Sequence, residues 1–305
     1  MQVASANFIS RLEWPTLSLL ALVYSVLAAL VWFHAVLPWW IILPIGSYFA
    51  CLHSSLQHEV LHGHPTRHQW LNDALGFAPL VLWLPYARYK HLHLLHHRDE
   101  QLTDPALDPE STYVGAADWA AMGPIGRWLH LATVTFAGRL LVSPWLSAWG
   151  LWRADGARIL AGDRGLARVW LLHLAGVAVV IGWLNACGIS PLAYALLVAW
   201  PATGLAKLRS LVEHREAERV EDRTAIVEHG GALGLLFLYN NLHVVHHARP
   251  GLPWYRLPAA WAEAKPALLA SWHGPYYRDY REVFTRWFIT PHNRGPRRLP
   301  LRTDG

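Results

Sequence analysis

Three short clusters of histidine contain the residues of this 305-residue chain that are best suited to chemistry. Ten of its 19 histidines lie in these clusters. Neutral imidazole is the commonest side-chain metal ligand, so the clusters predict a metal site. They read His58-Glu-Val-Leu-His62-Gly-His64, His91-Leu-His93-Leu-Leu-His96-His97 and His243-Val-Val-His246-His247.

The spacing within each cluster predicts which imidazoles point the same way. His58 and His62 are four residues apart at the end of an expected helix, so they share a face. The other two clusters each contain histidines at i, i+3 and i+4, which also share a helical face. Eight such histidines are too many for one metal ion and suit two, each with an open position. They are His58, His62, His93, His96, His97, His243, His246 and His247.

The first cluster also contains the His-Glu-x-x-His pattern of zinc proteases. In that alternative His58 and His62 bind one zinc ion and Glu59 is the general base. It leaves the other two clusters without a role, so the two-metal interpretation is preferred.

The composition indicates a membrane protein. Only 15% of the residues are charged, against about 25% in soluble domains. The 18 tryptophans suit the interfacial belts of a bilayer. The net charge of +5 is therefore expected at the inner face of a membrane, beside anionic lipid, and not on nucleic acid.

Four apolar segments predict transmembrane helices in two hairpins, with approximate ranges 16–37, 39–62, 169–185 and 191–206. Residues 71–87 are interrupted by Pro79 and Pro85, which favours a re-entrant or interfacial segment. Residues 119–166 mix tryptophans with spaced arginines, as interfacial amphipathic helices do. The expected fold is an all-α polytopic membrane protein, one domain over residues 1–305. Its helical cap holds the two metals, and a basic tail starts at about residue 290.

The basic residues predict the orientation of these spans. All 26 Lys and Arg lie outside the four apolar segments and the two turns within the hairpins. The positive-inside rule then places both termini and the metal site in the cytoplasm. We expect a multi-pass protein of a bacterial inner membrane. A metal transporter is the less favoured alternative, because transport predicts ionisable groups inside the spans. The uncharged runs 16–37, 39–57, 169–184 and 192–206 contain no Asp, Glu, Lys or Arg and only the histidines His34, His53 and His173.

The pattern His-x3-His, His-x2-His-His, His-x2-His-His resembles the membrane-bound fatty acid desaturase superfamily. His62 and His93 are 31 residues apart, a longer gap than hydroxylases of the other large histidine-box group generally have. The resemblance covers about residues 40–285. It extends to Gln69-Trp70-Leu71-Asn72-Asp73, Leu84-Pro85-Tyr86, the acidic stretch 104–110 and Gly251-Leu-Pro-Trp-Tyr-Arg-Leu-Pro258.

The resemblance implies two iron ions with histidine ligands, one of them a further histidine before the third cluster. His214 is the best candidate because it follows the fourth apolar segment, and His229 is its competitor. With His214 the expected ligand set has nine members. Ser210 stands where an asparagine holds a metal-bound water in some acyl-CoA desaturases, and Asn240 is the candidate substitute.

The implied reaction is O2-dependent desaturation of a fatty acyl chain, whether free, lipid-bound or carrier-bound. A hydroxylase or ketolase of an acyl lipid, alkane or carotenoid is the alternative, because it uses the same site. The spacing alone does not select iron over copper, zinc or manganese. No fused electron-transfer domain is visible, so we expect a separate ferredoxin or cytochrome b5 to dock on the basic face.

Acidic residues near the clusters are candidates to accept the second ring N–H of the ligating histidines. They are Glu59, Asp104, Asp108 and Glu213. His64 and His91 lie off the box spacing and are not expected in the ligand set.

Overall fold

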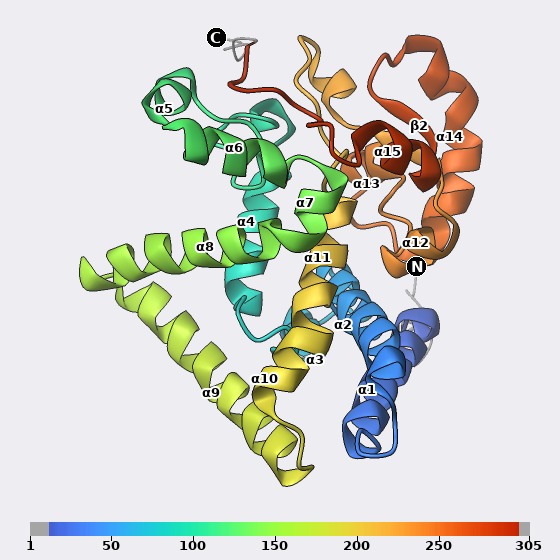
Figure 1. Ribbon diagram of the computed structural model, residues 1–305. Coiled ribbons are helices and arrows are strands. Elements are labelled where there is room, and N and C mark those ends of the chain that lie inside the picture. Colours follow the sequence, from blue (N-terminus) through green and yellow to red (C-terminus); the bar gives the residue numbers. More distant parts are fainter. Residues whose placement is uncertain (1–11, 299–305) are drawn as a thin grey trace.

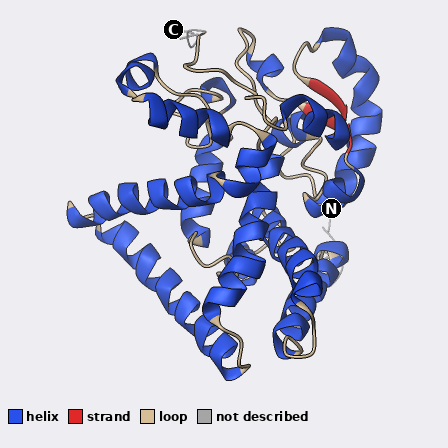
Figure 2. Ribbon diagram, viewed as in Figure 1, coloured by secondary structure: helices blue, strands red, loops and turns tan. Residues whose placement is uncertain are grey.

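The computed structural model describes residues 12–298, and most of them are helical (Figures 1 and 2). Long helices occupy the lower part of Figure 1, and a cap of shorter helices and loops, chiefly residues 97–142 and 210–298, lies above them. This confirms the mainly helical prediction. The all-α prediction missed one parallel two-stranded sheet, β1 (Ile226–His229) with β2 (Tyr276–Asp279). Strands of four residues are too short for a clear period-two pattern.

Two long helices, α1 (Trp14–Trp32) and α2 (Trp39–Leu61), form the first hairpin (Figure 1). Leu20, Val23 and Leu27 of α1 are buried in the main core, at the spacing of one helical face. His62 caps α2, and Gly63 follows with a φ of 103°. Glycine adopts this left-handed conformation without a Cβ penalty and commonly ends helices. The first histidine cluster therefore lies at the end of α2.

The second hairpin joins α9 (Arg164–Ala186) to a helix that runs from Pro191 to Arg209. This helix consists of α10 (Pro191–Tyr194), a π-helical turn (Ala195–Ala199) and α11 (Trp200–Arg209). Pro201 explains the π turn, because its ring would clash with the carbonyl of residue 197 in a regular α-helix.

Three helices of the described chain are long and apolar enough to cross a membrane. They are Trp14–Trp32, Arg164–Ala186 and Pro191–Arg209. The expected span at 39–62 is one continuous helix, but it is not among the three. Its second half carries the polar residues Gln57, His58 and Glu59, which are buried inside the protein. Four spans therefore stay a prediction.

The segment between the two hairpins begins with α3 (Gln69–Gly76) and α4 (Tyr86–His96). The intervening residues 77–85 form a loop against the second hairpin. The Tyr194 hydroxyl donates to the Leu80 carbonyl over 3.0 Å, and a ring nitrogen of His173 lies 2.9 Å from the Leu82 carbonyl. This loop holds the start of α4 in place.

Four helices follow, namely α5 (Ala116–Ala121), α6 (Pro124–Thr133), α7 (Phe136–Leu141) and α8 (Ser143–Leu160). In Figure 1, α8 runs across the upper end of α9. Trp145 and Trp149 of α8 are exposed on one face, as in a helix that lies at a membrane surface.

The C-terminal part of the cap contains α12 (Gly231–Leu236), α13 (His243–Ala248), α14 (Leu257–Ser271) and α15 (Tyr280–Trp287). The described part of the basic tail packs onto the cap: His292 N donates to Val134 O over 2.8 Å, and Arg297 N to Val114 O over 3.1 Å. The remainder of the tail, from residue 299, lies outside the described residues.

Candidate metal centre

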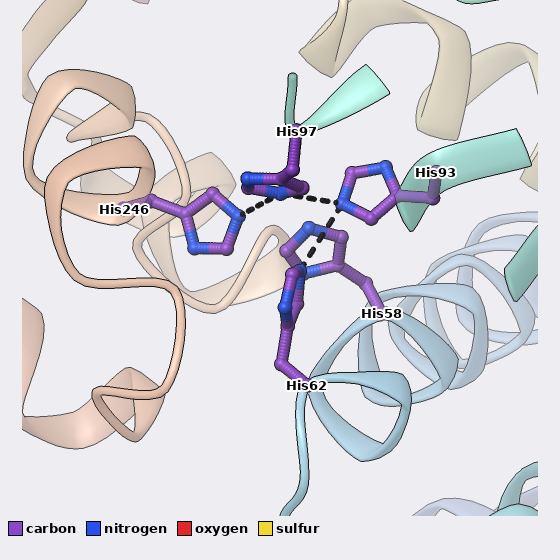
Figure 3. A group of neighbouring side chains, drawn as sticks. All are labelled: His58, His62, His93, His97 and His246. Carbon is purple, nitrogen blue, oxygen red and sulfur yellow. Dashed lines mark hydrogen bonds between the residues drawn. The ribbon is translucent and has the colours of Figure 1, made fainter. Parts of the chain in front are cut away.

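All nine histidines of the expected ligand set lie together where α2 and α4 meet the cap. They form two groups, and within each group one ring nitrogen per residue lies within 4.8 Å of all the others. The first group is His58, His62, His93, His97 and His246 (Figure 3). The second group is His96, His214, His243 and His247.

Helical spacing distributes the second and third clusters between the two groups. His93 and His97 of the second cluster are at i and i+4 and belong to the first group, whereas His96 belongs to the second. In the third cluster, His246 belongs to the first group, whereas His243 and His247, at i and i+4, belong to the second. The groups are adjacent, because the rings of His97 and His247 stack with centroids 4.4 Å apart. Helices α4 and α13 therefore each contribute histidines to both of two neighbouring sites.

The ring nitrogens approach one another as ligands of one ion would. In the first group, His93 Nε2 lies 3.0 Å from His97 Nε2 and 3.2 Å from His62 Nε2. Two nitrogens bonded to one metal at about 2.1 Å and at right angles lie about 3.0 Å apart. The buried Nε2 atoms of His58 and His247 have no hydrogen-bond partner within residues 12–298. Such atoms are costly unless something binds them, so the residues fit two metal ions.

The second group depends on His214, which lies outside the three clusters. Its Nε2 is 3.0 Å from the Nε2 atoms of both His96 and His243. An antiparallel bridge to Thr224 fixes its backbone. The competitor His229 is exposed at the end of β1 and belongs to neither group.

Carboxylates contact the Nδ1 atoms of several of the rings. Asp108 Oδ1 is 2.8 Å from His96 Nδ1, Glu110 Oε1 is 2.8 Å from His93 Nδ1, and Asp99 Oδ1 is 2.7 Å from His247 Nδ1. A carboxylate that accepts the Nδ1 proton fixes the tautomer and leaves Nε2 free to bind a metal. These three rings therefore direct Nε2 into the two groups.

Two of the four expected acidic partners lie behind histidines, and two do not. Asp108 contacts His96, and Glu213 Oε1 lies 3.5 Å from His243 Nδ1. Glu59 instead accepts the Trp254 backbone N–H over 3.0 Å, and Asp104 accepts backbone N–H groups in its own turn. The prediction was wrong for these two because their nearest donors are backbone groups of loops.

Asp99 and Glu110 also orient ligating histidines, although they were not among the four predicted carboxylates. Both lie in residues 99–110, which follow the second cluster and contain five acidic residues, and this run is the signal that could have indicated them. Arg223 holds the start of this stretch, because its Nη1 donates to the Glu100 carbonyl over 2.9 Å.

Asn240 lies behind His243, on the side away from the second group. Its Oδ1 is 3.2 Å from His243 Nδ1, and its Nδ2 donates to Glu213 Oε1 over 3.2 Å. Asn240 therefore orients His243 and links it to Glu213.

Burial and charge set the protonation of the histidines in the cap. Desolvation lowers the pKa of His93 to about 4 and holds the pKa values of His214, His243 and His246 well below the ordinary value. Burial also opposes protonation of His96, but Glu110 and Asp108 outweigh it and raise its pKa to about 9. Most rings are thus neutral at pH 7, the form that binds metals.

His64 and His91, which were not expected in the ligand set, lie outside both groups. His91 is exposed on α4. His64 Nδ1 is 2.7 Å from Glu13 Oε1, and its Nε2 is 4.0 Å from Glu59 Oε1. Glu59 therefore lies between His64 and the Trp254 backbone and belongs to neither histidine group. This position does not suit the general base of a zinc protease.

A cavity of about 800 Å³ lies beside the centre, between α2, α4, α6, α7, α8 and α11. Its lining includes Glu110, Tyr89 and Leu92. Glu110 contacts His93, and the Tyr89 ring lies 5.7 Å from the His93 ring. Pockets for small molecules have volumes of about 300–1,000 Å³, so the cavity is large enough for a small-molecule ligand.

A comparison with known protein families identifies a match over most of the chain. The family model for fatty acid desaturases matches residues 32–281, which contain all nine histidines. No curated protein matches the sequence. Since the family model covers most of the chain, the protein belongs to the fatty acid desaturase family.

Proposed function

We propose that this chain is a membrane diiron desaturase that uses O2 to introduce a double bond into a fatty acyl chain. Membership of its family already implies an oxidoreductase with a lipid or acyl substrate. The observation that carries the finer proposal is the convergence of nine histidines in two adjacent groups beside a cavity.

The two groups would hold the two iron ions, five histidines around one and four around the other. When bound, iron supplies the redox chemistry that O2 activation and removal of hydrogen from a methylene carbon require. The carboxylates Asp99, Asp108 and Glu110 keep their partner rings in orientation. The apolar part of the cavity holds the acyl chain and excludes water from it.

The membrane arrangement in this proposal has four spans, formed by α1, α2, α9 and the helix Pro191–Arg209, with the histidine groups on the cytoplasmic side. The second half of α2 leaves the lipid and enters the cap, which accounts for its polar residues. The +5 net charge favours docking of a separate acidic electron donor, ferredoxin or cytochrome b5, on the cytoplasmic face.

Lipid analysis of a host that expresses the chain tests this proposal. We expect acyl chains with a new double bond, which the double variant His246→Ala/His247→Ala does not produce. The matched control is His91→Ala, since His91 is exposed on α4 outside both groups, and it should retain the product.

Labelling with 18O2 separates desaturation from its alternative. A double bond retains no oxygen from 18O2, whereas a hydroxyl or keto product does, so a labelled product would assign the chain to the hydroxylases or ketolases. Purified metal-loaded protein that never consumes O2 with reductant and lipid present would overturn the enzymatic proposal.

A further inference from the structure

Nitrogen-bearing side chains line the cavity on the side of α6, α7 and α11. They are His130 of α6, Arg139 of α7 and Lys207 of α11. Gly204 of α11 brings the last two helices close together, because a Cβ at this position would lie 2.7 Å from the Leu140 carbonyl oxygen of α7. Arg139 and Lys207 therefore lie on the same side of the cavity.

These groups have no carboxylate within ion-pair distance in the described part of the chain, and Glu213 and Glu110 act on Arg139 and Lys207 only from farther away. Arg139 is only 6% exposed, and its Nε has no hydrogen-bond partner in the described part of the chain. Its Nη1 donates only a long bond, 3.4 Å, to Ser210 Oγ. Among residues 12–298, no carboxylate oxygen lies within 4.0 Å of the Arg139 or Lys207 nitrogens. The buried Nε2 of His130 is likewise without a partner there.

Other cations of the same region are paired. Arg88 Nε lies 3.0 Å from Asp155 Oδ2, and Arg209 Nε lies 3.4 Å from Glu213 Oε1. Glu110 also lines the cavity, but its Oε1 is engaged by His93 Nδ1. The unpaired charge in the cavity is therefore positive.

A buried cation without a partner is costly, so such a group normally marks a missing anion. Burial lowers the pKa of Arg139 to about 10, so the guanidinium is still charged at pH 7. Guanidinium and ammonium groups bind carboxylate and phosphate oxygens with short, charge-assisted hydrogen bonds. The remaining lining is largely apolar and includes Val81, Leu92, Leu129, Leu146 and Leu151.

We propose that Arg139, Lys207 and His130 bind the anionic head group of the acyl substrate, a carboxylate or a phosphate, while its chain lies along the apolar remainder of the cavity. This rests on the proposed function for the identity of the ligand as a substrate. It adds that the substrate enters the cavity with its charged head and not with its chain alone.

Binding measurements on purified full-length protein in nonionic detergent test the proposal. The ligands are palmitate, hexadecyl phosphate and the neutral hexadecanol, which share one chain length. We expect at least one anion to bind about tenfold or more tightly than hexadecanol, as for one charged hydrogen bond. The tighter of the two anions identifies the head group.

The variants Arg139→Gln and Lys207→Gln should each weaken binding of that anion by about tenfold and leave hexadecanol unchanged. Arg139→Lys should retain part of the selectivity, and it tests the site if Arg139→Gln does not fold. The control is Arg153→Gln, which removes an exposed arginine of α8 and should change neither affinity. Metal content and melting temperature verify that each variant is intact.

Equal affinity for the alcohol and both anions would overturn the inference, and so would an equal loss for all ligands in both variants. Binding is measured without turnover, so the result for head-group binding is independent of whether the chain is a desaturase. Head-group selectivity without any desaturation would contradict the proposed function alone.

Discussion

At the residue scale, the two nitrogens of a ligating histidine need different partners. Asp108 illustrates this, because it is buried and accepts from His96 Nδ1 over 2.8 Å. We predict that Asp108→Asn lowers metal affinity and activity by about 10- to 100-fold, since the amide no longer stabilises the required tautomer. Metal titration of the purified variant measures the effect.

The matched control for this change is Asp118→Asn, at an exposed position of α5. It should bind metal as the unmodified chain does. Full metal affinity in Asp108→Asn would show that the carboxylate does not orient His96.

His214 connects two other histidines of the second group. It approaches both His96 and His243 to 3.0 Å. We predict that His214→Ala lowers the bound iron from two ions toward one per chain, whereas His229→Ala leaves it at two. Elemental analysis of the purified variants decides between them, and the reverse result would make His229 the ligand.

Residue types and spacing select the eight histidines of the three clusters, because helical periodicity is local, whereas His214 was expected only from the family resemblance. Only two of the four carboxylates expected to contact the Nδ1 atoms of these rings do so. Asp99 and Glu110 reach His247 and His93 through the path of the loop after α4, and no local pattern specifies that path. Glu59 and Asp104 have the right charge and position in the sequence, but they contact backbone donors instead.

At the scale of elements, the contact between α7 and α11 places Arg139 and Lys207 along the cavity. We predict that Gly204→Ala destabilises the protein by about 1–3 kcal/mol, because its Cβ would lie 2.7 Å from the Leu140 carbonyl oxygen. Thermal unfolding in detergent measures this change.

The control is Gly182→Ala on α9, where a Cβ would meet nothing within 4 Å. Both glycines lie inside helices, so the gain in helix propensity is the same for both. Gly182→Ala should therefore be neutral or stabilising. Equal melting temperatures for the two variants would contradict the close packing of α7 and α11.

The long apolar segments predicted their helices well, but the sequence patterns around the site predicted its elements less well. Residues 39–62 form one helix, but its polar second half packs inside the protein and is not apolar enough for a span by composition. β1 and β2 are far apart in the sequence and only four residues long, so tertiary pairing decides their structure. His214 likewise depends on a bridge to Thr224.

At the scale of the whole molecule, the four-span proposal places the turn between α9 and α10 on the opposite side of the membrane from the histidines. Cys187 lies in this turn and is partly exposed, whereas Cys51 is buried in α2. We predict that a membrane-impermeant maleimide labels Cys187 in spheroplasts of a bacterial host and that Cys187→Ser abolishes the label.

A cysteine placed at the exposed Ser271 at the end of α14, in the Cys187→Ser background, provides the control. It should react only after the membrane is permeabilised. Labelling of position 271 in intact spheroplasts would reverse the proposed orientation.

In the proposed function, the two histidine groups bind two iron ions in different ligand sets. Mössbauer spectroscopy of the purified protein loaded with 57Fe tests it most directly. We predict two iron ions per chain and two quadrupole doublets of equal area, since one group has five histidines and the other four. A single doublet from one ion per chain, or protein that retains zinc and excludes iron, would contradict a diiron centre.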